Sequence, residues 1–447
     1  MIDDMKKVFL TTALLLVTAL VLTTACGDDE NEVKRPSGPN PEEVPVPTHH
    51  NDKSPGMILL SADEQQLVNR INVFGFGLLQ NAASQTRDNM VVSPLGTAMM
   101  LGMMADAAAV DTRNEILRLI DATDCPVDIV NGLFRTILKA NPDLDTDMKV
   151  DFANALYGNS GGGASLHEGY VKDLDECYSA PVGWLDFAHD ETPARINQPF
   201  ADKTGGLLTQ LVAPGTLSPQ GLTFMANATA ADVAWNHQFD PNNTKARTFT
   251  DRDGNKLTMP IMWLPDSVPY MADDSMQAID LLLGNSGSLH MVIAMPSDKA
   301  ADQDIDHLLA LITPDRWQKL LRDFKPSKLS IALPRFSLTS QWSLAEMLQP
   351  MGLTTALTTT GQYVGISAPS PRTLPLITTA LQATVVNVGE RGINLPYPVI
   401  DYPVTSSGTL PKATDKLPTF HAVRPFLFFI YEQSCGAIFM AGRFCGR

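Results

Sequence analysis

One short segment of the sequence has the spacing of a hydrolase nucleophile. Gly158-Asn-Ser160-Gly-Gly162 matches GxSxG and lies between a predicted strand and a predicted helix, where an activated serine would stand at a sharp turn. Such a serine needs an acid and a histidine as partners, and the eight histidines are scattered without a telling motif. Because so short a motif also describes a flexible glycine turn, we expect a turn here and predict no enzymatic activity.

The histidines and cysteines do not have the spacing of a metal site. No two histidines stand four residues apart, and the cysteine spacings differ from those of zinc ligands. Cys435 and Cys445 flank the last predicted strand, so a disulfide between them could close the C-terminus in an oxidising compartment. The sequence leaves the disulfide state of these two residues, and of Cys125 and Cys177, open.

The overall charge excludes one broad class of partner. The 447-residue chain carries 49 Asp and Glu against 33 Lys and Arg, which gives a net charge of −16. Nucleic-acid binding depends on basic side chains that neutralise phosphates, so we expect no nucleic-acid partner. A hydrophobic content of 44% is that of an ordinary globular protein.

The first residues are typical of a secretion signal. The basic pair Lys6-Lys7 precedes an apolar run, residues 8–22, that is short for a membrane span. The small residues before Cys26 resemble a bacterial lipobox, in which this cysteine is lipidated after cleavage. Residues 1–25 are therefore predicted to be a lipoprotein signal peptide. The alternative is a plain secretory signal in which Cys26 is incidental.

The next segment, residues 26–57, is predicted to be an extended tether. Prolines alternate there with acidic and polar residues, and no apolar period is present. The acidic run directly after Cys26 is similar to the signal that sends some lipoproteins to the outer face of the outer membrane. We therefore expect a surface-exposed outer-membrane lipoprotein that is attached to the membrane through lipidated Cys26.

The sequence after the tether mixes helices and strands within one predicted domain, residues 58–447. Ser61 and Glu64 have the spacing of a capping box in front of an amphipathic helix over residues 62–82. Residues 95–108 are apolar all round, as in a buried helix. The strands that follow show no βαβ rhythm, which favours an α+β fold with antiparallel sheets.

A long segment near the C-terminus interrupts this pattern. Residues 390–424 are rich in Pro, Ser, Thr and Gly, and they separate two apolar strands, one over 384–388 and one over 425–431. An insertion of this length without secondary structure is usually functional or disordered.

Short motifs throughout the remainder of the chain resemble those of the serpin family. Each is weak alone, but they are collinear over most of the sequence. They are Asn89–Pro94 for N-I-x-x-S-P, Val150–Tyr157 for A-N-A-L-[FY], Ile196-Asn197 for I-N, Ala226–Ala228 with Trp235 and Phe239–Pro241 for N-A…W…F-D-P, Met259–Met262 for V-P-M-M, Leu333–Ser337 for L-P-K-F, Arg424–Ile430 for H-P-F-L-F-x-I, and Phe439–Arg443 for F-x-G-R.

The resemblance implies a serpin fold with three β-sheets, eight or nine α-helices and an exposed reactive-centre loop. In this family a protease cleaves the loop, which then inserts as a central strand of the large sheet and carries the acyl-enzyme with it. The resemblance thus implies a serine or cysteine protease as the partner, no cofactor and a monomer that inhibits the protease.

The same resemblance suggests residues for the loop. Glu390-Arg391-Gly392 matches the E-[EK]-G that opens it, and Ile393 follows where inhibitors have Thr or Ser. The usual spacing from Gly392 gives Ser406-Ser407 as the candidate scissile bond. Three basic residues are alternative sites for a trypsin-like enzyme, namely Arg391, Lys412 and Lys416.

Other residues are expected at the sheet into which the loop would insert. By position, Trp235 would lie where the loop enters. Ser93 and Asn197 would lie beneath the centre, where a hydroxyl and an amide can pair backbone groups that are freed as strands part. At two positions of this set the chain departs from the family, because Gly96 replaces a usual Ser and Gln382 a usual His.

The loop sequence also supports an alternative function. Pro396 and Pro398 cannot donate hydrogen bonds to a β-ladder, and each buried partner left unpaired costs about 1–3 kcal/mol. The alternative is a non-inhibitory serpin-fold binding protein, whose hinge of Ile393, Pro396 and Pro398 does not insert and whose loop is only a protease substrate.

Overall fold

Nine α-helices and three β-sheets make up the part of the chain that the computed structural model describes, residues 56–146, 148–369, 373–395 and 417–446. These residues belong to one compact unit, Thr48–Arg447, and they confirm the predicted α+β class. The predicted signal peptide and most of the predicted tether lie outside the described residues.

Side chains cap the first turn of four of the nine described helices, through Ser61, Ser93, Asp304 and Thr313. At the first helix the predicted capping box is present, since Glu64 N–H donates to Ser61 Oγ at 3.3 Å and Ser61 N–H donates to Glu64 Oε2 at 2.8 Å.

Among the described residues, no helix combines the length and apolar character that crossing a membrane requires. The helices are α1 (Ala62–Gln85), α2 (Pro94–Ala107), α3 (Val110–Arg118), α4 (Val127–Ala140), α5 (Glu168–Tyr178), α6 (Thr192–Lys203), α7 (Ile305–Leu311), α8 (Pro314–Asp323) and α9 (Leu344–Leu348).

The largest sheet has nine strands and contains the C-terminal strands of the chain. Its order is β1-β17-β16-β9-β8-β7-β10-β15, and β6 pairs with β7 off this path. Its strands are β1 (Met90–Val92), β6 (Lys245–Thr250), β7 (Lys256–Ala272), β8 (Met276–Leu283), β9 (Leu289–Pro296), β10 (Lys325–Pro334), β15 (Thr419–His421), β16 (Phe426–Glu432) and β17 (Ile438–Phe444).

The second sheet has six strands and carries the beginning of the predicted loop. Its order is β11-β13-β14-β5-β2-β4, with β13 also paired directly and in parallel to β5. The third sheet is the short pair of β12 (Ile366–Ser367) and β3 (Ser165–Leu166). The six strands are β2 (Met148–Asn159), β4 (Val182–Leu185), β5 (Thr223–Ala234), β11 (Phe336–Ser343), β13 (Ile377–Val388) and β14 (Gly392–Ile393).

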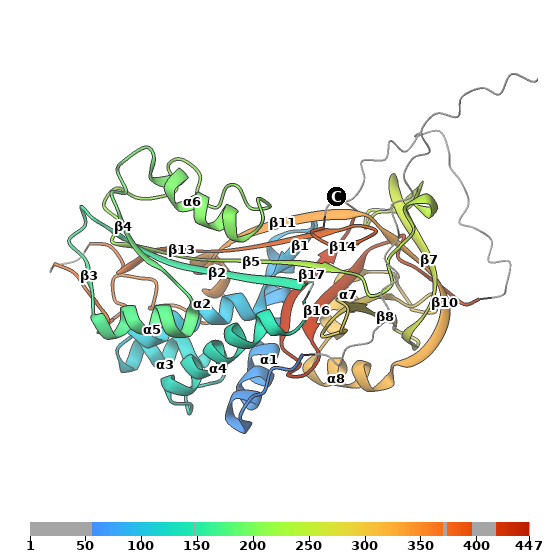
Figure 1. Cartoon of the computed structure of the whole chain (residues 1–447), viewed down its shortest axis with the longest axis horizontal. Helices are drawn as coiled ribbons and strands as arrows, with labels where there is room; N and C mark the ends of the chain where they lie inside the picture. The colour runs from blue at the N-terminus through green and yellow to red at the C-terminus, as the bar shows by residue number, and fades with distance from the viewer. Residues whose placement is uncertain (1–55, 147, 370–372, 396–416, 447) are drawn as a thin grey trace, which may run out of the picture. The chain divides into compact units, whose positions relative to one another are not determined.

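Helices cover both faces of the six-stranded sheet (Figure 1). On one face, Ile196 and Phe200 of α6 belong to a small apolar cluster that includes Phe224, Leu381 and Ala383 of the strands. On the other face lies the main core, in which α2 is buried on nearly all sides, as its apolar sequence predicted. Because side chains alternate along a strand, neighbouring residues of β5 and β13 face α6 and α2 in turn.

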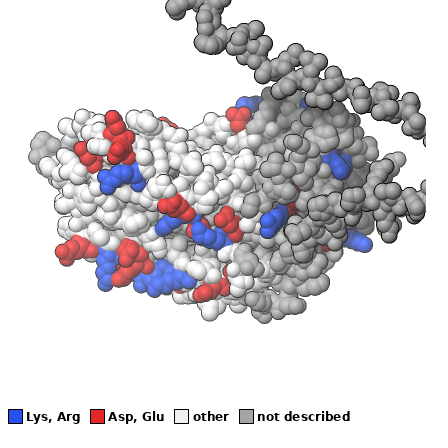
Figure 2. Space-filling model, turned by 45° about the horizontal axis from the view of Figure 1, so that its top comes forward, with Lys and Arg blue, Asp and Glu red and all other residues white. Residues whose placement is uncertain are grey.

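Charged side chains of both signs are mixed on the one face of the molecule that the space-filling view draws (Figure 2). Lysines and arginines lie among aspartates and glutamates on the face shown in Figure 2.

The four cysteines of the described residues are free thiols, so the possible disulfide between Cys435 and Cys445 is not present in the structure.

Candidate functional site

The start of the predicted loop folds back into the six-stranded sheet. After β13 ends at Val388, the chain turns, and β14 pairs antiparallel with β13 through Val388 and Ile393. The same two-residue strand pairs antiparallel with β5, where Gly392 lies opposite Ala234. We call residues 389–394 the hinge. The hinge therefore lies between β13 and β5, and these two strands pair directly with each other farther from the hinge.

Gly392 permits this close fit. A Cβ atom at this position would lie 2.0 Å from Val233 O, and the backbone has a φ of +154°. Only glycine tolerates such an approach without displacement of the neighbouring strand. The close packing of the hinge against β5 therefore explains why the E-R-G motif ends in glycine.

Trp235 holds the hinge turn at the end of β5. Its side chain is 1% exposed, and its Nε1–H donates to Gly389 O at 2.7 Å. Its backbone N–H donates to Arg391 O at 2.9 Å. The structure therefore places Trp235 in direct contact with the hinge.

Glu390 anchors the hinge through its side chain. The carboxylate is fully buried and accepts hydrogen bonds from Arg335 Nη2 at 2.5 Å and Thr244 Oγ1 at 2.7 Å. Its backbone carbonyl accepts from Phe239 N–H at 3.0 Å. A buried carboxylate needs such partners, because desolvation alone would strongly disfavour its charge. Arg391, by contrast, is exposed.

Beyond the hinge, the two central strands β13 and β5 pair directly with each other. β13 and β5 form eight register pairs, from Ile377 with Thr223 to Val385 with Ala230. These pairs must separate before any longer segment of the loop can occupy the centre of the sheet.

A row of four register-paired residues crosses this central region. They lie on β11, β13, β5 and β2, and we call them the polar row. They are Trp342, Gln382, Asn227 and Asn154.

Two asparagines of the polar row form a buried network. Asn227 Nδ2 donates to Asn154 Oδ1 at 2.8 Å, and Asn154 Nδ2 donates to Tyr178 O at 2.8 Å. Thr229 Oγ1 donates to Asn227 Oδ1 at 3.0 Å. Gln382 is buried as well, and its Nε2 donates to Ala383 O and Thr384 Oγ1, each at 2.8 Å.

Ser93 lies beside this network as the N-cap of α2. Its Oγ accepts from Gly96 N–H at 2.9 Å and donates to Phe439 O of β17 at 2.7 Å. A Cβ atom on Gly96 would lie 2.4 Å from Asn227 Oδ1 and 2.6 Å from Thr229 Oγ1. Gly96 therefore fits a site in which Thr229 already supplies a hydroxyl.

The structure does not bring Asn197 to the polar row, which corrects its expected position beneath the sheet's centre. Asn197 lies on α6, and its Oδ1 accepts from the N–H groups of Leu211 at 2.9 Å and Val212 at 2.7 Å. It thus fastens the connection that follows α6. Asn154 and Asn227 occupy the expected position, and their signal was an asparagine between apolar residues in the middle of each strand.

On the C-terminal side of the predicted loop, the first strand is β15, which pairs in parallel with β10. His421 Nε2 lies 3.2 Å from Ser330 Oγ, which accepts a hydrogen bond from Trp263 Nε1–H at 2.9 Å. Burial, with a contribution from nearby Arg247, lowers the pKa of His421 below its usual value.

Other predicted features have simpler outcomes. Ser160 lies in an exposed turn that Asn159 organises, since Gly161 N–H donates to Asn159 Oδ1 at 3.1 Å. Within the described ranges, no group of three or more His, Cys, Asp or Glu residues could hold a metal ion. The predicted lipidation site Cys26, the candidate scissile bond Ser406-Ser407, and Pro396 and Pro398 lie outside the described residues.

Comparison with known proteins gives the class that this fold defines. The family model described as Serpin (serine protease inhibitor) matches residues 69–446. An uncharacterised serpin-like protein of Thermococcus kodakarensis is 25% identical over 441 residues, which cover 97% of this chain and 98% of that protein. Antithrombin-III of Mus musculus is 25% identical over 368 residues, covering 80% of this chain and 76% of that protein.

Solved structures show the same fold. The native thermophilic serpin tengpin matches with a TM-score of 0.75 at 19% identity, covering 87% of this chain and 95% of that one. A complex of thyroxine-binding globulin with thyroxine matches with a TM-score of 0.74 at 19% identity, covering 85% and 98%. The chain belongs to the serpin family, and the resemblance of its motifs is confirmed.

Proposed function

We propose that this protein inhibits serine or cysteine proteases by cleavage of its loop and insertion of the loop into the six-stranded sheet. One observation carries the proposal: β14 already lies between β13 and β5 and is antiparallel to both. A longer inserted strand would have the same neighbours and directions. Insertion would therefore extend an existing strand instead of nucleating a new one.

The ladder pattern favours insertion once the loop is free. Full insertion separates eight parallel register pairs between β13 and β5 and forms two antiparallel ladders in their place. Antiparallel pairing is slightly more stable per residue than parallel pairing. The amides of Asn227, Asn154 and Gln382 can each donate and accept, so they can form new pairs with groups exposed as the strands part.

The second candidate is a binding protein that has the serpin fold but does not inhibit. Two observations favour it. The loop contains Pro396 and Pro398, which cannot donate to a ladder. One structure with the same fold is a complex of thyroxine-binding globulin with thyroxine, so that protein of this fold binds a ligand.

Incubation with a panel of serine and cysteine proteases separates the two candidates. The proposal predicts a complex that survives SDS with at least one protease. Loop cleavage by every reactive protease without any such complex would favour the binding protein. A matched pair of hinge variants sharpens the result. Ile393→Glu places a charge at a fully buried position and should convert the inhibitor into a substrate, whereas exposed Arg391→Glu should not.

We also propose that the inhibitor is a monomer held at the bacterial surface by lipidated Cys26, and we assign Ser160 no catalytic role. The lipobox-like segment before Cys26 and the acidic run after it support the tether. Cys26→Ser should shift the protein from the detergent phase to the aqueous phase in a phase-partition experiment. Equal partition of both forms would overturn the tether without bearing on inhibition.

A further inference from the structure

Asn394, the residue at which the hinge leaves the sheet, bonds to both strands that flank it. Its Oδ1 accepts from Asn387 N–H of β13 at 2.8 Å. Its Nδ2 donates to Ala231 O of β5 at 2.9 Å and to Val385 O of β13 at 3.3 Å. Its backbone N–H donates to Asn387 O at 2.7 Å. One side chain thus joins the two strands across the point where they separate.

The side-chain amide replaces a peptide unit of a continuing strand. Directly opposed residues of an antiparallel ladder exchange two N–H···O bonds in the hydrogen-bonded type of pair. Asn394 and Asn387 make one of these bonds through their backbones, and Asn394 Oδ1 accepts the other in place of its own carbonyl oxygen. The backbone of Asn394 has a φ of +55°, which turns the chain out of the sheet. Asparagine tolerates this conformation better than most residues.

The position of this residue in the sheet gives its bonds a function. Above Asn394 three strands are paired, and below it β13 and β5 pair directly from Val385 and Ala230 downward. At such a junction the polar backbone groups of both strands lose their partners. Asn394 supplies both a donor and an acceptor to them, as a further peptide unit of the strand would.

We propose that Asn394 is a positioning residue that fixes the resting hinge at two inserted residues, by acting as a substitute for the next peptide unit. Deeper insertion requires Asn394 to release Asn387, Ala231 and Val385 and to adopt an extended backbone. Asn394 therefore works as a latch against spontaneous insertion. Its effect on protease inhibition rests on the function proposed above, whereas its effect on the resting hinge does not.

Hydrogen–deuterium exchange of the intact protein tests the latch without any protease. In Asn394→Ala, the Asn387 amide loses its acceptor, and its exchange should accelerate by about tenfold or more, equivalent to about 1.4 kcal/mol. Asn394→Leu keeps the size of the side chain but removes its donor and acceptor, so the Asn387 amide should lose protection in this variant as well. Arg391→Ala, an exposed change in the same hinge, is the matched control and should leave exchange unchanged.

Exchange of the Asn387 amide within about twofold of the parent protein in Asn394→Ala would overturn the proposal. If that variant fails to fold, exchange within about twofold of the parent protein in Asn394→Leu would do the same. A second measurement addresses the latch itself: the rate at which the loop becomes resistant to proteolysis on incubation should rise in Asn394→Ala. If exchange is faster in Asn394→Ala but the parent protein forms no complex with any protease, the proposed function is contradicted. The proposed role of Asn394 in the resting hinge is then still supported.

Discussion

The carboxylate of Glu390 and the guanidinium of Arg335 form an ion pair of 2.5 Å where the loop begins. Arg335 stands between β10 of the nine-stranded sheet and β11 of the six-stranded sheet. The Glu390 side chain is fully buried, and that of Arg335 is 14% exposed. The pair therefore ties the hinge to the connection between the two sheets.

Arg335→Ala should lower the free energy of unfolding by about 3–5 kcal/mol, because it leaves a buried carboxylate without its cation. Denaturant unfolding of both forms measures the difference. The double variant Arg335→Met with Glu390→Leu is the control and should recover much of the loss, since it removes both charges. A loss below about 1 kcal/mol in the single variant would show that the pair does not anchor the hinge.

Gly96→Ser should destabilise the protein, although both residues are small. The added Cβ would lie 2.4 Å from Asn227 Oδ1 and 2.6 Å from Thr229 Oγ1, so the network must shift at a cost of about 1–3 kcal/mol. Thermal unfolding gives the comparison. Adding Thr229→Ala should return part of the stability, because it removes the competing hydroxyl. If the two changes have additive effects, the hydroxyl of Thr229 does not occupy the place of the missing serine.

Arg443 should be far more important for stability than its neighbour Arg87. Arg443 is fully buried, pairs with Asp306, and donates to Thr86 O at 2.6 Å. Arg443→Lys should cost about 2 kcal/mol, since one ammonium cannot reproduce the fork of donors.

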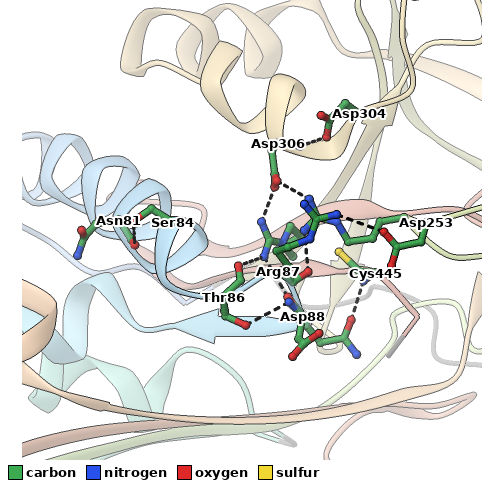
Figure 3. Close-up of polar contacts among 12 residues, drawn as sticks. Asn81, Ser84, Thr86, Arg87, Asp88, Asp253, Asp304, Asp306 and Cys445 are labelled. Carbon is green, nitrogen blue, oxygen red and sulfur yellow. Dashed lines mark hydrogen bonds and ion pairs between the residues drawn. The ribbon is translucent and has the colours of Figure 1, made fainter.

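Arg87→Lys is the matched control in the same cluster (Figure 3). The Arg87 side chain is 74% exposed and pairs with exposed Asp253, so this change should alter stability by less than about 0.5 kcal/mol. Similar effects of the two lysine variants would refute the assigned anchoring role of Arg443.

His421 should make the protein less stable as the pH falls. Its pKa in the folded protein lies below its usual value of 6.5, so the unfolded chain binds a proton more readily. Stability then decreases as the pH falls from above 6.5 to the folded pKa and does not decrease further through this group. Melting temperatures of the parent and His421→Gln across this range should differ in slope. Equal slopes for the parent and His421→Gln would contradict the account.

Local patterns predicted much of the fold because they depend on nearby residues. The capping box at Ser61 and the buried helix α2 both have short-range signals. β11 lacks such a signal, since Phe336–Ser343 is mostly polar and is defined by its pairing with β13. Strand pairing of that kind is a tertiary property.

The residues of the site could likewise be predicted from the sequence only in part. Position relative to the family motifs selected Asn197, whereas the buried network uses Asn154 and Asn227, which are 73 residues apart in sequence. Their contact arises from the register of β2 with β5. The role of Asn394 was likewise hidden, because it depends on where two distant strands separate.

The melting temperature of the loop-cleaved protein tests the central claim that the loop inserts. The loop is cut by a protease that forms no complex, and the cleaved product is compared with the intact protein and with cleaved Ile393→Glu. Two new ladders should raise the melting temperature of the parent by roughly 10 °C or more, and that of Ile393→Glu by much less. An unchanged melting temperature after complete cleavage of the parent would contradict the account.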